Sequence, residues 1–210
     1  MKLYDCEAAP SPRKVRLFLA KKGIEVETIQ VDLPKGEQFS DWYRQKNPNC
    51  TVPALELEEG IVLCESEAIC RYLEEMYPDP ILFGRSAIER ALVNEWLQII
   101  DLEGYIPVAN YIRNHSRMFK DRALPGATSI EQIPALAERE FHRAQQFFLT
   151  INEALESNLP WVLGDYFSVI DIFAFVSLKF AQKCQLQPQQ ELKPLQIWLQ
   201  KTQDVLGEVR

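Results

Sequence analysis

One short segment of the chain combines residue types that could hold an amino-acid group of a small ligand. Glu65 precedes Ser66, and Ser66 stands before an apolar run with helical spacing. Free N–H groups and the partial positive charge at a helix N-terminus favour a carboxylate. The Glu65 carboxylate offers an acceptor for an ammonium group. The pair predicts a site for a ligand that carries both groups, and a simple N-cap role for Ser66 is compatible with it.

A second segment, Thr51-Val52-Pro53-Ala54, offers backbone rather than side-chain groups. A proline directly before a strand can be trans and merely mark the edge of a sheet. The alternative is a cis Val52–Pro53 bond, which would turn the N–H and C=O of Val52 outward. Those groups could pair with a peptide ligand as an additional strand does. On the residues alone, both interpretations stay open.

Ser11 and Lys35 are two further candidates. Ser11-Pro12 has the pattern of a helix start, with serine as the N-cap and proline at the first helical position. The N-cap role is favoured; the alternative is a hydroxyl at the positive end of the helix that donates to a thiolate. Lys35 stands in a Pro-Lys-Gly turn, where it could bind a second carboxylate or simply be solvated.

The histidines and tyrosines of the second half carry less specific signals. His142 lies off the apolar stripe of its predicted helix, so we expect it to be exposed. His115 ends a long helical pattern and is expected at the surface, with a role in a substrate pocket as the alternative. Tyr105 and Tyr111 belong to the same pattern, where aromatic residues are more often core than pocket.

Strand and helix signals alternate over the first eighty residues. Strands are predicted at 2–6, 29–33, 55–57 and 61–63, and helices at 11–22, 39–45 and 69–76. The resulting order is β-α-β-α-β-β-α. A strand–helix–strand unit predicts a parallel pair, and the hairpin adds antiparallel strands. We therefore predict an α/β domain over residues 1–80.

Strand signals cease after residue 86, and helical patterns fill the remainder. One long helix is predicted over 87–117, with a kink at Pro107. Ser168-x-x-Asp171 resembles a capping box in front of a strongly apolar helix, and a last helix is predicted over 195–205. Another helix carries a narrow apolar stripe, formed by Ala137, Phe141, Ala144, Phe148, Ile151 and Leu155. An all-helical domain is therefore expected over residues 87–210.

Composition excludes several classes of function. Acidic residues number 30 against 23 basic ones, and the net charge of −7 disfavours binding to nucleic acid. The five cysteines form no CxxC pair, and with two histidines they indicate a reduced cytoplasmic protein without a metal site. The sequence shows no signal-peptide pattern and no apolar run long enough to cross a membrane.

Read together, these segments resemble the cytosolic glutathione transferase family. The matching pieces follow the family's order and spacing and span nearly the whole chain. They are Met1-Lys2-Leu3-Tyr4, Pro12-Arg13-Lys14-Val15-Arg16-Leu17 and the stretches 46–55, 65–73 and 164–172. Residues 8–13 and 33–37 are most similar to the branch of the second yeast glutathione transferase and its bacterial relatives.

The resemblance implies a thioredoxin-like N-terminal domain that binds glutathione as a substrate, with no cofactor. It places a cis Val52–Pro53 bond at the cysteinyl part of glutathione, Glu65 and Ser66 at the γ-glutamyl end, and Lys35 at the glycyl carboxylate. It also implies a homodimer. The helical domain would supply the hydrophobic substrate side of the pocket, and the residues expected there are Ala9, Tyr105, Tyr111 and His115.

One position departs from the family's pattern. Several branches place a catalytic serine or cysteine just before the first helix, whereas alignment on Arg13-Lys14-Val15-Arg16 puts Ala9 there. Alanine cannot activate a thiol. Ser11 is the candidate catalytic residue in its place, and the alternatives are the helix N-terminus itself or a water held by the helical domain.

The sequence thus predicts a cytoplasmic detoxification enzyme that transfers the glutathione thiolate to a hydrophobic electrophile. Ala9 favours one alternative, a non-catalytic glutathione-binding or protein-interaction scaffold of the same fold. A glutathione-dependent thiol oxidoreductase is the other alternative. It needs a cysteine at the start of the first helix, and residues 8–13 contain none.

Overall fold

The computed structural model describes residues 1–207 and divides into two compact units. The N-terminal unit comprises Met1–Pro80 and Pro125–Thr128. The helical unit comprises Ile81–Leu124 and the described residues from Ser129 onward.

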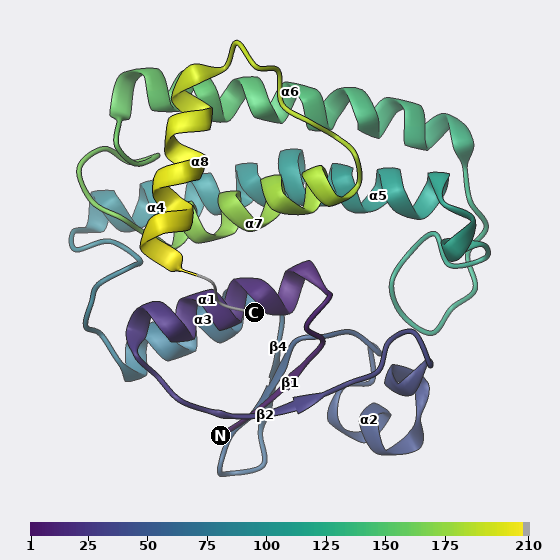
Figure 1. The fold of residues 1–210 in the computed structure, drawn as a ribbon. Coiled ribbons are helices and arrows are strands. Elements are labelled where there is room, and N and C mark those ends of the chain that lie inside the picture. Colours follow the sequence, from purple (N-terminus) through teal and green to yellow (C-terminus); the bar gives the residue numbers. More distant parts are fainter. Residues whose placement is uncertain (208–210) are drawn as a thin grey trace. The chain divides into compact units, whose positions relative to one another are not determined.

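The N-terminal unit is built on one four-stranded sheet. Its strands are β1 (Lys2–Asp5), β2 (Glu27–Gln30), β3 (Ala54–Glu56) and β4 (Val62–Cys64), in the order β2-β1-β3-β4. β1 and β2 are parallel, and the other pairs are antiparallel. The helices are α1 (Pro10–Lys22), α2 (Asp41–Lys46) and α3 (Ser66–Met76), with the 3-10 turn η1 (Glu37–Phe39) before α2. α1 and α3 pack together beside the sheet (Figure 1). The predicted order of elements is confirmed.

The second strand begins and ends earlier than the sequence predicts. The alternation of Ile29, Val31 and Leu33 predicts a strand over 29–33, whereas the ladder pairs Glu27 to Gln30 with β1. The apolar alternation continues beyond the strand because Val31 enters a buried cluster with Tyr4, and Ile29 and Leu33 pack against that cluster. Burial, not strand pairing, accounts for the pattern after Gln30.

The first helix begins two residues before Pro12, which the sequence predicts as its first helical residue. Ala9 is the N-cap, with φ −85° and ψ 139°, and Pro10 is the first helical residue. The N-cap interpretation of Ser11 is therefore wrong. The Ala9 N–H donates to the carbonyl of Cys6 at 2.9 Å, and the fixed φ of Pro10 suits a first helical turn. At the other end, Gly23 stops the helix in the left-handed region, as predicted.

The helical unit contains the segments predicted from residue 87 onward, with one difference in the long first pattern. That pattern is divided into α4 (Ala87–Ile99), a π-helical turn η2 (Ile100–Tyr105) and α5 (Ile106–His115). The irregular turn directly precedes Pro107 and includes Glu103, the residue four positions before it, where a proline disturbs helical bonding. A Cβ on Gly104 would lie 2.6 Å from the ring of Phe147, so this close approach requires glycine.

The other helices of this unit form its core. They are η3 (Arg117–Phe119), α6 (Pro134–Asn158), α7 (Val169–Lys183) and α8 (Lys193–Leu206). α7 is buried along most of its length, and α8 packs against α6 and α7 (Figure 1). The predicted stripe of α6 is buried except for Phe141, which is 37% exposed.

The predicted capping box at the start of α7 is present. Asp171 accepts hydrogen bonds from the N–H and hydroxyl of Ser168, the N–H of Val162 and the indole N–H of Trp198. The carboxyl group is fully buried, and burial raises the pKa of Asp171 to about 6. Asp171 therefore joins the start of α7 to α8 and closes the helix end with groups of the protein itself.

Candidate active site

Three segments meet at one end of the sheet because of its register. Tyr4 near the end of β1 pairs with Ala54 at the start of β3, and Ala54 pairs with Cys64 at the end of β4. The loop 6–9 that leaves β1, the segment 52–53 that enters β3 and the residues 65–66 that leave β4 therefore lie at the same end. The sheet brings the loop 6–9 beside candidates that lie more than forty residues further along the sequence.

The start of α3 leaves its backbone donors available. Glu65 is the N-cap and makes no side-chain capping bond, and its side chain is exposed. Among residues 1–207, no acceptor is found for the N–H groups of Ser66, Glu67 and Ala68. Such an end suits a carboxylate from outside the protein.

Glu65 holds an uncommon backbone conformation, with φ 70° and ψ 126°. Residues other than glycine adopt positive φ at a cost, and such residues are concentrated at binding and catalytic sites. The conformation places a carboxylate beside the open end of α3.

Ser66 is the first helical residue of α3, so its interpretation as the N-cap is wrong. Its hydroxyl donates to the carbonyl of Ser11 at 2.9 Å, and the side chain is buried. This bond joins the first turns of α1 and α3. The hydroxyl of Ser66 is therefore used within the protein, and its backbone N–H is the group that this residue has left for a carboxylate from outside.

The Val52–Pro53 bond is cis, the second of the two interpretations that the sequence left open. Within the described part of the chain, the N–H and C=O of Val52 have no partner. The preceding carbonyl of Thr51 accepts bonds from the hydroxyl of Tyr43 and from Nδ2 of Asn47 at 2.8 Å. α2 therefore fixes the backbone that leads to Val52.

The start of α1 differs from the start of α3 in its donors. Proline occupies the first and third helical positions, Pro10 and Pro12, and proline has no N–H. The N–H of Ala9 is used by the Cys6 carbonyl. Ser11 thus supplies the one backbone N–H of the first three helical positions. The sequence suggested a helix end with several donors for an anion, and the structure offers fewer.

Lys35 lies in the loop that follows β2 and is 84% exposed at its side chain. Its ammonium group pairs with Asp32 at 2.7 Å. The hydrogen bond with Asp32 raises the pKa of Lys35, and the same bond lowers the pKa of Asp32. Lys35 is therefore a cation on a flexible side chain, already in contact with one carboxylate.

The three candidates of the helical unit lie in aromatic contacts. The ring of Tyr105 is 5.7 Å from that of Phe180. Tyr111 stacks on His115 at 5.3 Å, and its ring is 6.0 Å from Phe141. The sequence assigned Phe141 to the buried stripe, so its part in this exposed cluster was missed. Ala9 belongs to the N-terminal unit, and its grouping with these residues stays a prediction.

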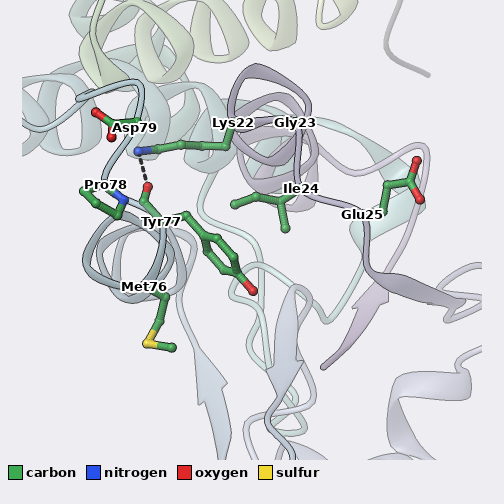
Figure 2. A pocket seen from close by; sticks show the side chains of 8 residues that line it. All are labelled: Lys22, Gly23, Ile24, Glu25, Met76, Tyr77, Pro78 and Asp79. Carbon is green, nitrogen blue, oxygen red and sulfur yellow. Dashed lines mark hydrogen bonds between the residues drawn. The ribbon is translucent and has the colours of Figure 1, made fainter.

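A surface pocket of about 500 Å³ lies at the other ends of α1 and α3 (Figure 2). The Lys22 ammonium beside it is buried and contacts the carbonyls of Tyr77 and Pro80 at 2.7 Å and Glu74 at 2.5 Å. Since the 13 residues of α1 rise by about 20 Å, this pocket is remote from the helix starts. Lys22 joins the ends of the two helices, and the pocket is separate from the candidate site.

Residues 1–207 contain neither a cluster of metal-ligating side chains nor a membrane-spanning helix. No group of three or more His, Cys, Asp or Glu side chains there is placed to hold a metal ion. In the same residues, no helix is both long enough and apolar enough to span a membrane.

Comparison with known proteins identifies the family. A model of the N-terminal domain of glutathione S-transferases matches residues 9–76. Glutathione S-transferase 2 of Saccharomyces cerevisiae is 30% identical over 208 residues, which cover 97% of this chain and 85% of that protein. The chain belongs to the glutathione S-transferase family.

Solved structures of this family share the fold over nearly their whole length. A glutathione S-transferase domain-containing protein of Marinobacter aquaeolei VT8 has a TM-score of 0.89 at 32% identity, and 97% of each chain is covered. Gtt2 of Saccharomyces cerevisiae has a TM-score of 0.88 at 29% identity, covering 97% of this chain and 96% of its own. The glutathione S-transferase fold is confirmed, with a thioredoxin-like N-terminal part followed by helices, as is the resemblance to the second yeast enzyme.

Proposed function

We propose that this chain is an enzyme that binds glutathione in its N-terminal unit and transfers the thiolate to a hydrophobic electrophile. The observation that carries the proposal is the open start of α3, where Glu65 at φ 70° stands before N–H groups without acceptors. The yeast relative named glutathione S-transferase 2, similar over nearly the whole chain, supports it.

Each part of glutathione finds a matching group in the N-terminal unit. The γ-glutamyl carboxylate accepts from the first-turn N–H groups of α3, and its ammonium donates to Glu65. The cysteinyl backbone pairs with the N–H and C=O of Val52 as an added strand does. The glycyl carboxylate would form an ion pair with the ammonium group of Lys35. This pair would replace the one that Lys35 makes with Asp32.

The reaction needs the thiolate form of glutathione, and a free thiol has a pKa of about 8.5. Ser11 carries both a hydroxyl and the one N–H of the first three positions of α1, and these donors stabilise the anion. The thiol proton leaves to solvent, and the sulfur lone pair forms the new C–S bond. A leaving group then departs with its electron pair, or the electrophile keeps that pair after addition.

The helical unit supplies apolar surface for the second substrate, and Tyr105, Tyr111 and His115 are the residues proposed for it. Their partly exposed rings match flat or branched apolar molecules. We also propose that the protein is a cytoplasmic homodimer and that it acts in detoxification. Ala9 keeps a non-catalytic glutathione-binding scaffold as the second candidate, because the usual activating side chain is missing.

Calorimetric titration with glutathione tests the binding site. Glu65→Gln keeps the size of the side chain and removes its charge, so we expect about a tenfold weaker affinity. Glu59→Gln is the matched control, because Glu59 is also exposed but lies in the β3–β4 turn at the other end of the hairpin. Equal affinities of the two variants would contradict the proposed site.

Product formation separates the enzyme from the scaffold. With an activated aryl chloride as the electrophile, the wild type is expected to form the thioether and release chloride faster than glutathione does in buffer. Binding of glutathione without any acceleration would favour the scaffold.

A further inference from the structure

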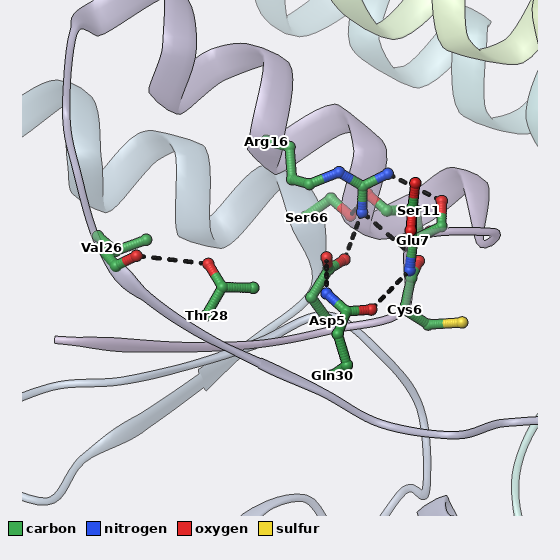
Figure 3. A network of polar contacts seen from close by, with 9 residues as sticks. All are labelled: Asp5, Cys6, Glu7, Ser11, Arg16, Val26, Thr28, Gln30 and Ser66. Carbon is green, nitrogen blue, oxygen red and sulfur yellow. Dashed lines mark hydrogen bonds and ion pairs between the residues drawn. The ribbon is translucent and has the colours of Figure 1, made fainter. Parts of the chain in front are cut away.

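A network of polar contacts, with a buried ion pair at its centre, lies beside the loop 6–9 that leads to α1 (Figure 3). Asp5, the last residue of β1, is 1% exposed and forms an ion pair with Arg16 of α1, whose side chain is 11% exposed. The loop 6–9 passes from Asp5 to the start of α1 directly beside this pair. Ala9, at the end of this loop, has no side chain that could activate a thiol, so the loop offers only backbone groups at that position.

Gln30, the last residue of β2, connects the ion pair to the loop. Its Nε2 donates to Asp5 at 2.7 Å, and its Oε1 accepts the N–H of Glu7 at 2.9 Å. Arg16 contacts the same loop from the other side, since its Nη2 donates to the carbonyl of Glu7 at 3.0 Å. Both backbone groups of Glu7 are therefore held by side chains from other elements.

The network decides which backbone donors the loop can offer. The N–H of Glu7 is used by Gln30, and the N–H of Ala9 by the Cys6 carbonyl. Within residues 1–207, no acceptor is found for the N–H of Ala8, which is exposed. A backbone N–H held in place is an effective donor to a developing or full anion.

The hydrogen bonds of Arg16 are also directed to this loop and to Asp5. Its Nε is buried and has no hydrogen-bond partner among the described residues, while its terminal nitrogens contact Asp5 and the carbonyl of Glu7. An unpaired buried polar atom requires an explanation. The guanidinium group is placed to hold the loop at the expense of its own full hydrogen bonding.

We propose that Gln30, with the Asp5–Arg16 ion pair, is a positioning residue that fixes the loop 6–9 so that the Ala8 N–H faces the glutathione sulfur. This inference rests on the proposed function. It assigns a role in thiol activation to an exposed side chain on a neighbouring strand, which acts through the backbone of Glu7. Gln30 itself does not touch the reacting atoms.

Gln30→Ala and Gln30→Met test the inference without disturbing the core, because Gln30 is exposed. Methionine keeps the length of the side chain and removes both hydrogen bonds. Both variants are expected to lower kcat about tenfold, with the KM for glutathione changed less than about twofold. The ultraviolet absorbance of bound thiolate at a fixed pH below the pKa of free glutathione falls in parallel.

Thr28→Ala is the matched control. Thr28 lies on the same strand, is also exposed, and its hydroxyl donates to the Val26 carbonyl at 3.4 Å rather than to the loop (Figure 3). This variant is expected to keep the wild-type kcat and thiolate absorbance. If Gln30 had only a structural role on the strand surface, all three variants would show the same kcat and the same thiolate absorbance.

The outcomes distinguish the inference from the proposed function. If the wild type forms thiolate and product, and Gln30→Met does so equally well, the positioning role is overturned while the enzyme stands. If saturating glutathione gives no thiolate absorbance in the wild type, the proposed function fails and the inference fails with it.

Discussion

The starts of α3 and α7 look similar in sequence and differ in what they do. Ser66 and Ser168 each stand before an apolar helix, and each was predicted to cap it. Ser168 is the cap of α7, and Asp171 completes the capping box inside the core. Ser66 is instead the first helical residue of α3, whose donors have no acceptor in residues 1–207.

The difference shows how a helix start becomes either a structural joint or a binding site. α7 carries an acid at the third helical position that turns back to the cap, so the protein satisfies its own donors. α3 has alanine at that position, and its N-cap side chain makes no capping bond. An external carboxylate is the group that the open start lacks.

The largest expected effect is on stability, at the start of α7, which we call closed because Asp171 satisfies the helix's own donors. Asp171→Ala removes the acceptor of buried donors from Ser168, Val162 and Trp198, so we expect a loss of about 4 kcal/mol in the free energy of unfolding. Chemical denaturation measures it. Asp165→Ala, an exposed position nearby, is the control and should change little. A loss below about 1 kcal/mol would show that α7 does not depend on its capping box.

The closed start also makes stability depend on pH. Burial raises the pKa of Asp171 from 3.8 to about 6, so between these values the folded protein holds a proton that the unfolded chain releases. The contribution of Asp171 to the unfolding free energy is thus full below about pH 4 and decreases by about 3 kcal/mol as the pH rises through 6. Denaturation of the wild type and Asp171→Asn across this range measures it. Parallel pH profiles would contradict the raised pKa.

The next effect concerns the open start. Glu67→Pro removes one N–H from the first turn of α3, as Pro12 does in α1, where a helical serine also precedes the proline. We expect glutathione affinity to fall at least about tenfold, because the lost bond is to a carboxylate. Glu67→Ala loses the same ion pair with Arg71 and keeps the N–H, so it serves as the control in calorimetry. Equal affinities of the two variants would mean that this N–H does not bind the ligand.

The smallest expected effect is a change in stability on substitution of Glu65, and it is opposite in direction to the change in function. Glu65→Gly relieves the positive φ, so we expect the protein to gain about 1 kcal/mol of stability while its affinity for glutathione falls. Thermal unfolding and calorimetry on the same preparation measure both. A variant that loses stability would indicate that Glu65 holds the fold rather than the ligand.

Local signals in the sequence predicted much of this fold and some of the site. Gly23 as a helix stop, the hairpin of β3 and β4 and the box Ser168–Asp171 depend on neighbours in the chain, and all are present. The Glu65–Ser66 pair was located for the same reason, although the helix starts at Ser66 itself.

The features that the sequence did not reveal depend on contacts between distant residues. The close approach of Phe147 to the π-helical turn requires glycine at position 104, and the start of α1 is set by a bond back to Cys6. Gln30 has no pattern of its own, because an exposed glutamine at a strand end is unremarkable until its two partners are seen. Such roles come from strand register, which places side chains of β2 beside the loop after β1.

The most direct test of the central claim is a pH titration of thiolate absorbance with glutathione bound to the wild type, compared with Ser11→Ala. The account predicts a bound thiol whose pKa lies well below the value of about 8.5 for a free thiol, and a smaller lowering in Ser11→Ala. A thiol that titrates as free glutathione does, or no binding at millimolar glutathione, would contradict the proposal that this chain activates glutathione.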